Sequence, residues 1–201
     1  MWYAASMTKV DGRTARAQQN RARVVDAMLE LVDETGLEPT VEHVVARSGI
    51  SERSIFRYFD NLDDLRSAVI NRNFDRVEPL LDVDDLGQGT PEDRIARFVE
   101  SRLRVCEALA GPSRLARRNA PLQPLVAADI SRFRRLLAEQ VRAHFAPELV
   151  ARPKAEADDL EVVIDVLVSV EAWDQMATAH GRTRAQIRRA WTRSLTALLG
   201  R

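Results

Sequence analysis

A glycine between two short helical patterns is the feature that most restricts how this chain can fold. A short apolar face on the first pattern is formed by three valines, Val41, Val44 and Val45. Gly49 follows, and it can take the positive φ that a tight turn between two helices demands. Ser51 is a typical N-cap residue. The spacing therefore predicts a second helix over residues 52–59 and a helix-turn-helix over residues 40–65.

The second predicted helix has two different faces. Ile55 and Phe59 are four residues apart, so they share the face that packs inward. At 100° per residue, the opposite face carries Arg53, Ser54, Phe56 and Arg57. Arginine can donate two hydrogen bonds to O6 and N7 of guanine, and a serine hydroxyl can meet a base or a phosphate. Such a helix can read the major groove of DNA, although the spacing alone favours an ordinary solvated face.

The order of residues in this segment is more specific than their spacing. It runs as Thr40-Val41, Val44-Val45-Ala46, Ser48-Gly49-Ile50-Ser51, Ser54-Ile55-Phe56-Arg57-Tyr58-Phe59 and Asp63-Asp64-Leu65. In this order the segment resembles the N-terminal DNA-binding domain of the TetR family of bacterial transcriptional regulators. The resemblance covers residues 20–70, and the rest of the chain is similar only in its architecture.

The resemblance implies roles for single residues. In the family, a Thr that begins the first of the two helices touches phosphate, which implies this role for Thr40, and Tyr58 inherits a phosphate contact. Two positions depart from the family pattern: Phe56 replaces a Tyr and loses a hydroxyl contact, and Leu62 replaces a Lys that binds the backbone. The predicted DNA-contacting residues are Thr40, Ser51, Arg53, Ser54, Phe56, Arg57 and Tyr58.

The charge balance does not by itself point to nucleic acid. The chain has 201 residues, of which 45% are apolar and 30% are charged, and its 30 basic and 30 acidic residues cancel. Residues 24–70 are more acidic than basic. The prediction of DNA binding therefore depends on where the arginines point.

The start of the chain has a different character. Residues 1–19 lack an apolar period, and five basic residues face only Asp11 up to residue 23: Lys9, Arg13, Arg16, Arg21 and Arg23. This pattern predicts a flexible basic arm over residues 1–19. The arm could lie along phosphates or in a minor groove, and a plain disordered tail fits the pattern equally well.

Helical periodicity continues through the remaining chain, which predicts an all-α fold. A first helix from about Asn20 to Thr35 completes a three-helix DNA-binding domain over residues 20–66. A connector helix, capped by Asn61, and an acidic loop before Pro91 lead into a larger helical domain over residues 67–201 for ligand binding and dimerisation.

Three features of the larger domain carry predictions. One helix is expected to end near Gly111-Pro112, and a long amphipathic helix runs from Leu125 to Phe145. Residues 155–180 are apolar nearly all round, so we expect one helix buried on two sides. A final helix starts at Thr183. We expect these last two helices, about residues 155–200, to form the interface of a homodimer, as the family resemblance also implies.

The resemblance also implies a pocket for an unknown small-molecule effector among the middle helices. The candidate lining residues are aromatic or sulfur-bearing, with one charge: Phe98, Arg102, Cys106, Phe133, Trp173 and Met176. For each of them, ordinary core packing is the more common alternative.

The sequence argues against enzymatic, metal and membrane functions. His43, His144 and His180 lie on separate elements without metal-ligand spacing, and no glycine-rich phosphate loop is present. We therefore expect no catalytic residues, no metal site and no cofactor. One cysteine excludes a disulfide framework, and no apolar stretch approaches the ~20 residues of a membrane span, so we expect a cytoplasmic protein.

Two functions stay open. The leading hypothesis is a dimeric, ligand-responsive repressor that binds an inverted-repeat operator in double-stranded DNA. The alternative is a dimeric all-α small-molecule-binding or interaction protein whose helix-turn-helix has lost DNA binding, which Phe56, Leu62 and the acidic balance of residues 24–70 favour.

Overall fold

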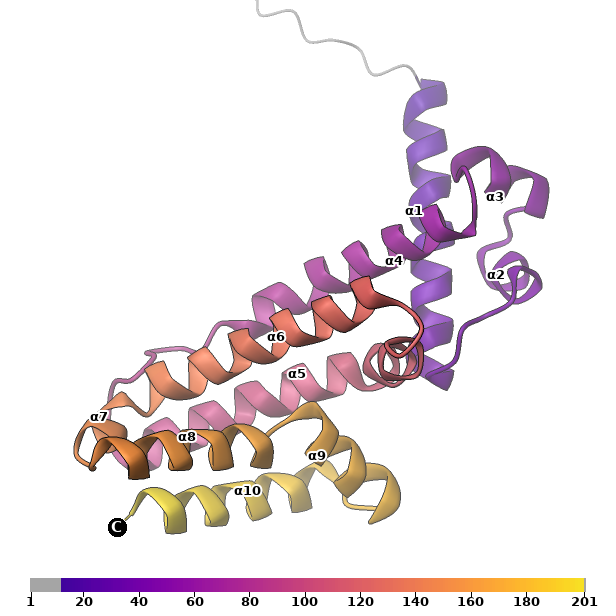
Figure 1. Cartoon of the computed structure of the whole chain (residues 1–201). Helices are drawn as coiled ribbons and strands as arrows, with labels where there is room; N and C mark the ends of the chain where they lie inside the picture. The colour runs from indigo at the N-terminus through magenta and orange to yellow at the C-terminus, as the bar shows by residue number, and fades with distance from the viewer. Residues whose placement is uncertain (1–11, 201) are drawn as a thin grey trace, which may run out of the picture.

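The computed structural model describes residues 12–200, and helices form the whole framework of this range (Figure 1). The predicted all-α fold is confirmed. The N-terminal helices are α1 (Gly12–Thr35), α2 (Val41–Ser48), α3 (Glu52–Tyr58) and α4 (Leu62–Val77). The later helices are α5 (Pro91–Asn119), α6 (Pro124–His144), α7 (Ala146–Val150), α8 (Lys154–Leu167), α9 (Val170–Asp174) and α10 (Arg184–Leu199). A 3₁₀ turn (Glu78–Leu81) follows α4, and a π-helical turn (Gln175–Ala179) follows α9.

Two hydrophobic cores lie at the two ends of α4. Leu65 and Val69 belong to the smaller core, which α1, α2 and α3 complete. Val77 belongs to the larger core, which is built around α5. Helix α5 is central because it contacts α1, α4, α6, α9 and α10 (Figure 1). The predicted domain boundary between residues 66 and 67 stays a prediction, since α4 runs unbroken across it.

Helix α1 starts earlier than predicted. It begins at Gly12, so residues 12–19 are helical, and the prediction of a flexible arm is wrong for them. This stretch lacks an apolar stripe because it extends past the small core, while its alanines, glutamines and arginines are good helix formers. Residues 1–11 of the predicted arm lie outside the described residues.

The predicted helix end at Gly111-Pro112 is also wrong, because α5 continues to Asn119. Pro112 has no N–H to donate to the carbonyl of Ala108, four residues earlier. That carbonyl instead accepts a hydrogen bond from Nη2 of Arg76, at 2.8 Å. Gly111 allows the backbones of α5 and α1 to meet, since a Cβ there would lie 2.2 Å from the carbonyl oxygen of Val32.

The segment predicted as one helix over residues 155–180 has three parts. Helix α8 ends at Leu167, and Ser169 caps α9 by accepting a hydrogen bond from the amide of Ala172, so the chain bends there. In the single chain, α8 is not buried on two sides. One of its faces exposes the side chains of Val162 (63%), Val163 (49%) and Val166 (62%).

Candidate nucleic-acid interface

Hydrogen bonds hold both the turn between α2 and α3 and the start of α2. Gly49 ends α2 with φ +69°, and its N–H donates to the carbonyl of Val45 at 2.9 Å. Arg23 of α1 donates to the carbonyl of Ser48 at 2.7 Å. Thr40 caps the start of α2, where its side chain accepts from the amide of His43. The predicted helix-turn-helix is therefore formed, with the glycine where the turn needs it.

Helix α3 has the two faces that its sequence predicts. Ile55 and Phe59 are buried in the small core, and Arg53, Phe56 and Arg57 are exposed. Ser54 is half-buried. Ser51 stands at the N-cap position, but its hydroxyl donates to Oγ of Ser54 at 3.0 Å and makes no capping bond. The outer face thus exposes two arginines and an aromatic ring.

Tyr58 and Arg57 form a pair at the end of α3. The Tyr58 hydroxyl oxygen accepts hydrogen bonds from Nδ2 of Asn20 and from Nη2 of Arg57, each at 3.1 Å. These two bonds, that of Asn20 first, lower the pKa of Tyr58 below its ordinary value. The Arg57 guanidinium also lies 5.2 Å from the centre of the Tyr58 ring. Through Tyr58, Arg57 is therefore held toward α1. The Tyr58 hydroxyl group uses its oxygen as acceptor in both bonds, so its proton can be donated to a bound partner.

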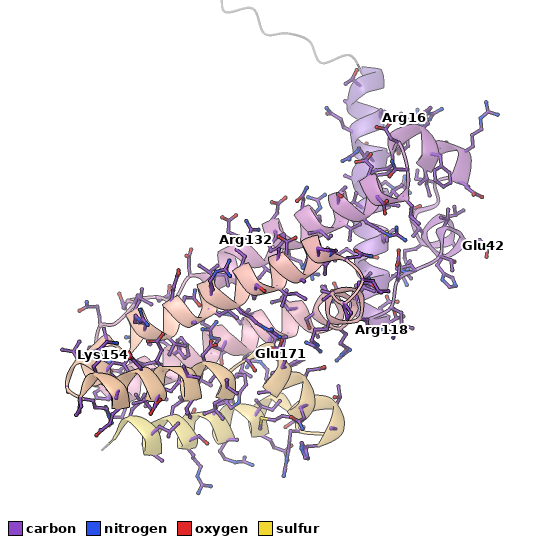
Figure 2. All side chains as sticks on the ribbon, viewed as in Figure 1. Arg16, Glu42, Arg118, Arg132, Lys154 and Glu171 are labelled. Atoms are coloured by element: carbon purple, nitrogen blue, oxygen red, sulfur yellow. The ribbon has the colours of Figure 1, made fainter. Side chains whose placement is uncertain are left out.

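A hollow between α1 and α3 is lined by side chains that can donate hydrogen bonds. It holds two guanidiniums, two serine hydroxyls, an amide and a phenol, and none of its lining residues is acidic: Arg16, Ala17, Asn20, Gly49, Ile50, Ser51, Ser54, Arg57 and Tyr58. Donors of this kind suit phosphate oxygens. Arg16 reaches the hollow because α1 begins at Gly12 (Figure 2). Sequence reasoning missed this arrangement, because it placed Arg16 on a flexible arm.

Several acidic residues of α1 and of the loop before α2 are paired with arginines of α2 and α4. Arg47 makes two hydrogen bonds of 2.8 Å to the carboxylate of Glu34, and this contact, Arg47 being the main cause, lowers the pKa of Glu34. Arg72 pairs with Asp26 at 2.8 Å. Leu62, where the family pattern has a Lys, packs against the small core and offers no charge.

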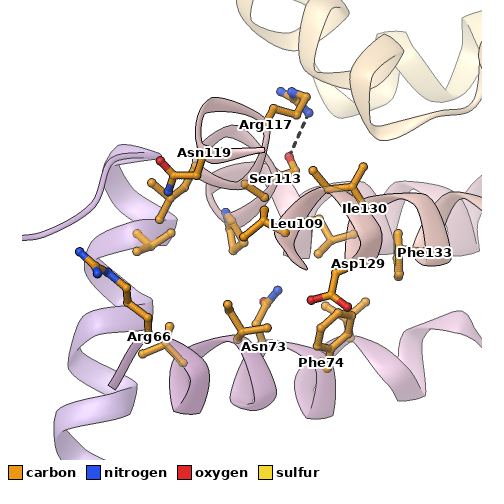
Figure 3. Close-up of a pocket in the computed structure, with 18 of the residues that line it drawn as sticks. Arg66, Asn73, Phe74, Leu109, Ser113, Arg117, Asn119, Asp129, Ile130 and Phe133 are labelled. Carbon is orange, nitrogen blue, oxygen red and sulfur yellow. Dashed lines mark hydrogen bonds between the residues drawn. The ribbon is translucent and has the colours of Figure 1, made fainter. Parts of the chain in front are cut away.

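An apolar cavity of about 210 Å³ lies between the two domains, where α1 and α4 face α5, α6 and α9 (Figure 3). Of the six predicted pocket residues, only Phe133 lines it. Phe98, Arg102, Cys106 and Trp173 are buried elsewhere, and Met176 borders a separate hollow beside α10. Sequence reasoning missed this cavity because its walls come from both domains.

Arg102 and His144 are buried in the larger domain and bond main-chain groups, while Nε and Nη1 of Arg102 have no hydrogen-bond partner among the described residues. The Arg102 guanidinium donates to the carbonyl of Leu137 at 2.6 Å, and burial lowers its pKa to about 10. Burial raises the pKa of Cys106 to about 12, which keeps its thiol protonated and unreactive. His144 lies between the carbonyl of Arg94, 2.9 Å from Nε2, and the amide of Gly87, 3.3 Å from Nδ1.

Residues 12–200 contain no cluster of three or more His, Cys, Asp or Glu side chains that could hold a metal ion. In the same part of the chain, no helix combines the length and apolarity needed to cross a membrane.

Comparisons with known proteins agree with this geometry. Residues 24–69 match the model of a family described as bacterial regulatory proteins, tetR family. No curated protein matches the chain. A tetR-family transcriptional regulator from Streptomyces coelicolor superposes with a TM-score of 0.68 at 17% identity, covering 90% of this chain and 80% of that one. A TetR-like transcriptional regulator from Rhodococcus sp. RHA1 gives 0.60 at 18% identity, covering 90% and 97%. The predicted family resemblance is confirmed: the N-terminal domain is a TetR-family helix-turn-helix, and the chain has the fold of TetR-family regulators.

Proposed function

Since the N-terminal domain is a TetR-family helix-turn-helix, we propose that this chain is a cytoplasmic transcriptional regulator that binds an inverted-repeat operator as a homodimer. One observation carries the proposal: α3 stands on a fixed turn and exposes Arg53 and Phe56 on one face. Arg53 would read a guanine, and the ring of Phe56 (47% exposed) would meet a thymine methyl group.

Thr40, Tyr58 and the hollow between α1 and α3 would hold the DNA backbone. Thr40 is exposed at the start of α2, where a phosphate can approach the helix N-terminus. Arg16, Arg57 and the hydroxyls of Ser51 and Ser54 would donate to neighbouring phosphates. Arg57 is thus proposed to anchor the backbone, in contrast to the base-reading role expected from the sequence.

Dimerisation through α8 and α10 would place two reading heads, the helix-turn-helix domain (residues 20–66) of each copy, on one DNA duplex. The exposed valines of α8 form an apolar stripe that a second copy would cover. Exposed acids on α8, Glu156 and Asp159, and exposed arginines on α10, Arg189 and Arg193, give the partner surfaces opposite charges. Two heads about one helical turn apart, ~34 Å, would read an inverted repeat. A small molecule in the interdomain cavity would change their separation and release the operator.

Selection from a pool of random duplexes, followed by sequencing, tests the DNA-binding function. We expect the full chain to enrich an inverted repeat, and Arg53→Ala to lose the preference at one position of each half-site. The alternative, a small-molecule-binding or interaction protein without DNA binding, is favoured by Leu62 and Phe56. If the full chain retains no duplex even at low salt, where backbone attraction is strongest, the regulator is overturned and the alternative is favoured.

A further inference from the structure

We infer that the interdomain cavity binds a small apolar molecule that carries one positive charge, and that Asp129 is its counter-ion. The inference deepens the ligand response proposed above and depends on it only for the effect on DNA. It names the chemistry of the ligand and the residues that select it.

The walls of the cavity set the size and the body of the ligand. Most of them are aliphatic or aromatic, among them Leu29 of α1, Ile70 and Phe74 of α4, Leu109 of α5, and Ile130 and Phe133 of α6. The volume of about 210 Å³ is below the ~300–1,000 Å³ of pockets for drug-sized molecules. The cavity therefore fits a molecule with a single ring or a short hydrocarbon chain.

The charged groups on the wall decide which ligand charge is accepted. Arg66 pairs with Glu38 at 2.5 Å, Arg134 with Glu171 at 2.6 Å, and Arg117 with Asp174 at 2.8 Å. These arginines are occupied, so an anionic ligand would have to break an ion pair to gain one.

Asp129 is the exception among these lining charges. Its nearest cation is Arg132 Nη2 at 3.9 Å, beyond hydrogen-bond distance, and no hydrogen bond joins the carboxylate to another described residue. The Asp129 side chain is 43% exposed, so its carboxylate lies at the rim of the cavity, near the ring of Phe74 and beside Phe133 (Figure 3). A carboxylate next to two aromatic rings is a site for an organic cation.

The ring of Phe74 already makes a cation–π contact within the protein. The Arg132 guanidinium lies 5.4 Å from the ring centre, and its side chain is 67% exposed. An exposed guanidinium gives up such a contact at little cost, because water solvates it fully. The cationic group of a ligand can therefore take its place between Phe74 and Asp129 while the apolar body fills the cavity.

The ligand would lie against the contact that joins the two domains. Asn73 points into the cavity (Figure 3), and its Oδ1 accepts a hydrogen bond from Arg76 at 2.8 Å. Arg76 in turn holds Asp33 of α1 and the carbonyl of Ala108 of α5. A ligand that touches Asn73 and the α1 wall at once has direct contact with the reading head, so its binding energy can depend on how that head is placed.

Three molecules of matched shape test the inference on the full chain without DNA: phenylbutylamine, phenylbutanol and phenylbutyrate at neutral pH. Titration calorimetry should give binding of the amine about tenfold tighter than that of the alcohol, and weaker binding still of the acid. Asp129→Asn should remove the advantage of the amine and leave binding of the alcohol unchanged. Glu139→Gln, an exposed carboxylate on the same helix away from the cavity, should change neither.

The location is tested by Ile70→Trp, which fills the cavity from its exposed rim. This variant should abolish binding of all three molecules while the circular dichroism spectrum stays that of the wild type. Equal affinities for amine and alcohol, a preference that survives Asp129→Asn, or binding of none of the three would overturn the inference. Failure to select a DNA motif would overturn the proposed regulator alone, because these titrations contain no DNA.

Discussion

Arg76 of α4 donates a hydrogen bond to the main-chain carbonyl of Ala108 in α5, at 2.8 Å. Within α5 that carbonyl has no helical donor, because Pro112 stands where the N–H would be. The same guanidinium binds the carboxylate of Asp33 in α1. One side chain therefore joins the reading head, the connector helix and the central helix of the larger domain.

Replacing Arg76 with alanine should destabilise the chain by about 2 kcal/mol, because it leaves a partly buried carbonyl and a carboxylate without their donor. Urea unfolding followed by circular dichroism measures this. Arg72→Ala is the matched control on the same helix, since Arg72 makes a more exposed pair with Asp26 that should contribute at most ~1 kcal/mol. If the two variants lose the same free energy of unfolding, the bond to Ala108 does not add to stability beyond an exposed ion pair.

The pH dependence of stability should carry a contribution from His144. Burial lowers the pKa of His144 below its ordinary value, and its neutral form alone can donate to Arg94 and accept from Gly87. A group whose pKa is lower in the folded state stabilises the fold above its unfolded pKa, ~6.5, and loses that contribution as the pH falls through the folded value. The free energy of unfolding should therefore decrease on acidification below this pH.

Unfolding of His144→Gln in urea at several pH values isolates this contribution. At pH ~8 the wild type should be more stable by about 1–3 kcal/mol, and the difference should shrink as the solution is made acidic. His43→Gln serves as control, since His43 is exposed on α2. A difference between wild type and His144→Gln that is constant with pH would contradict the prediction.

The features that could be predicted from the sequence are turns, helix caps and the buried faces of single helices. Gly49, the cap at Asn61 and the inward pair on α3 all follow from interactions within a few residues. The path of α5 through Pro112 could not be predicted, because the replacement donor, Arg76, comes from a helix over 30 residues away.

The cavity was unpredictable for a similar reason. Its walls combine α1 and α4 with α5, α6 and α9, and periodicity within one helix gives no information about which faces leave space between them. Phe133, an aromatic residue of α6, lines the cavity, and its role in binding a ligand stays a prediction. Phe98 and Cys106, predicted as lining residues in the same way, are core residues.

Two arginines should affect DNA binding in different ways. Arg16→Ala should weaken binding to selected and scrambled duplexes alike and lower the slope of log affinity against log salt by about one, as for a phosphate contact. Arg53→Ala should cost about 1–3 kcal/mol on the selected duplex only. Fluorescence anisotropy over a range of salt concentrations separates the two. Arg135→Ala, an exposed arginine of α6, should behave as the wild type, and a uniform loss for Arg53→Ala would exclude a base contact.

The valine stripe on α8 leads to a prediction about assembly. Val166→Asp places a carboxylate in the middle of the surface that a second copy would cover, so the dimer dissociation constant should rise by at least about tenfold. Light scattering coupled to size-exclusion chromatography gives the mass of wild type and variant over a range of concentrations. Val150→Asp, on an isolated valine of α7 that is 85% exposed, should leave the mass unchanged. Binding to the inverted repeat should fall together with the dimer, since one head alone reads only half of the site. A Val166→Asp protein that remains dimeric would place the interface elsewhere on the molecule.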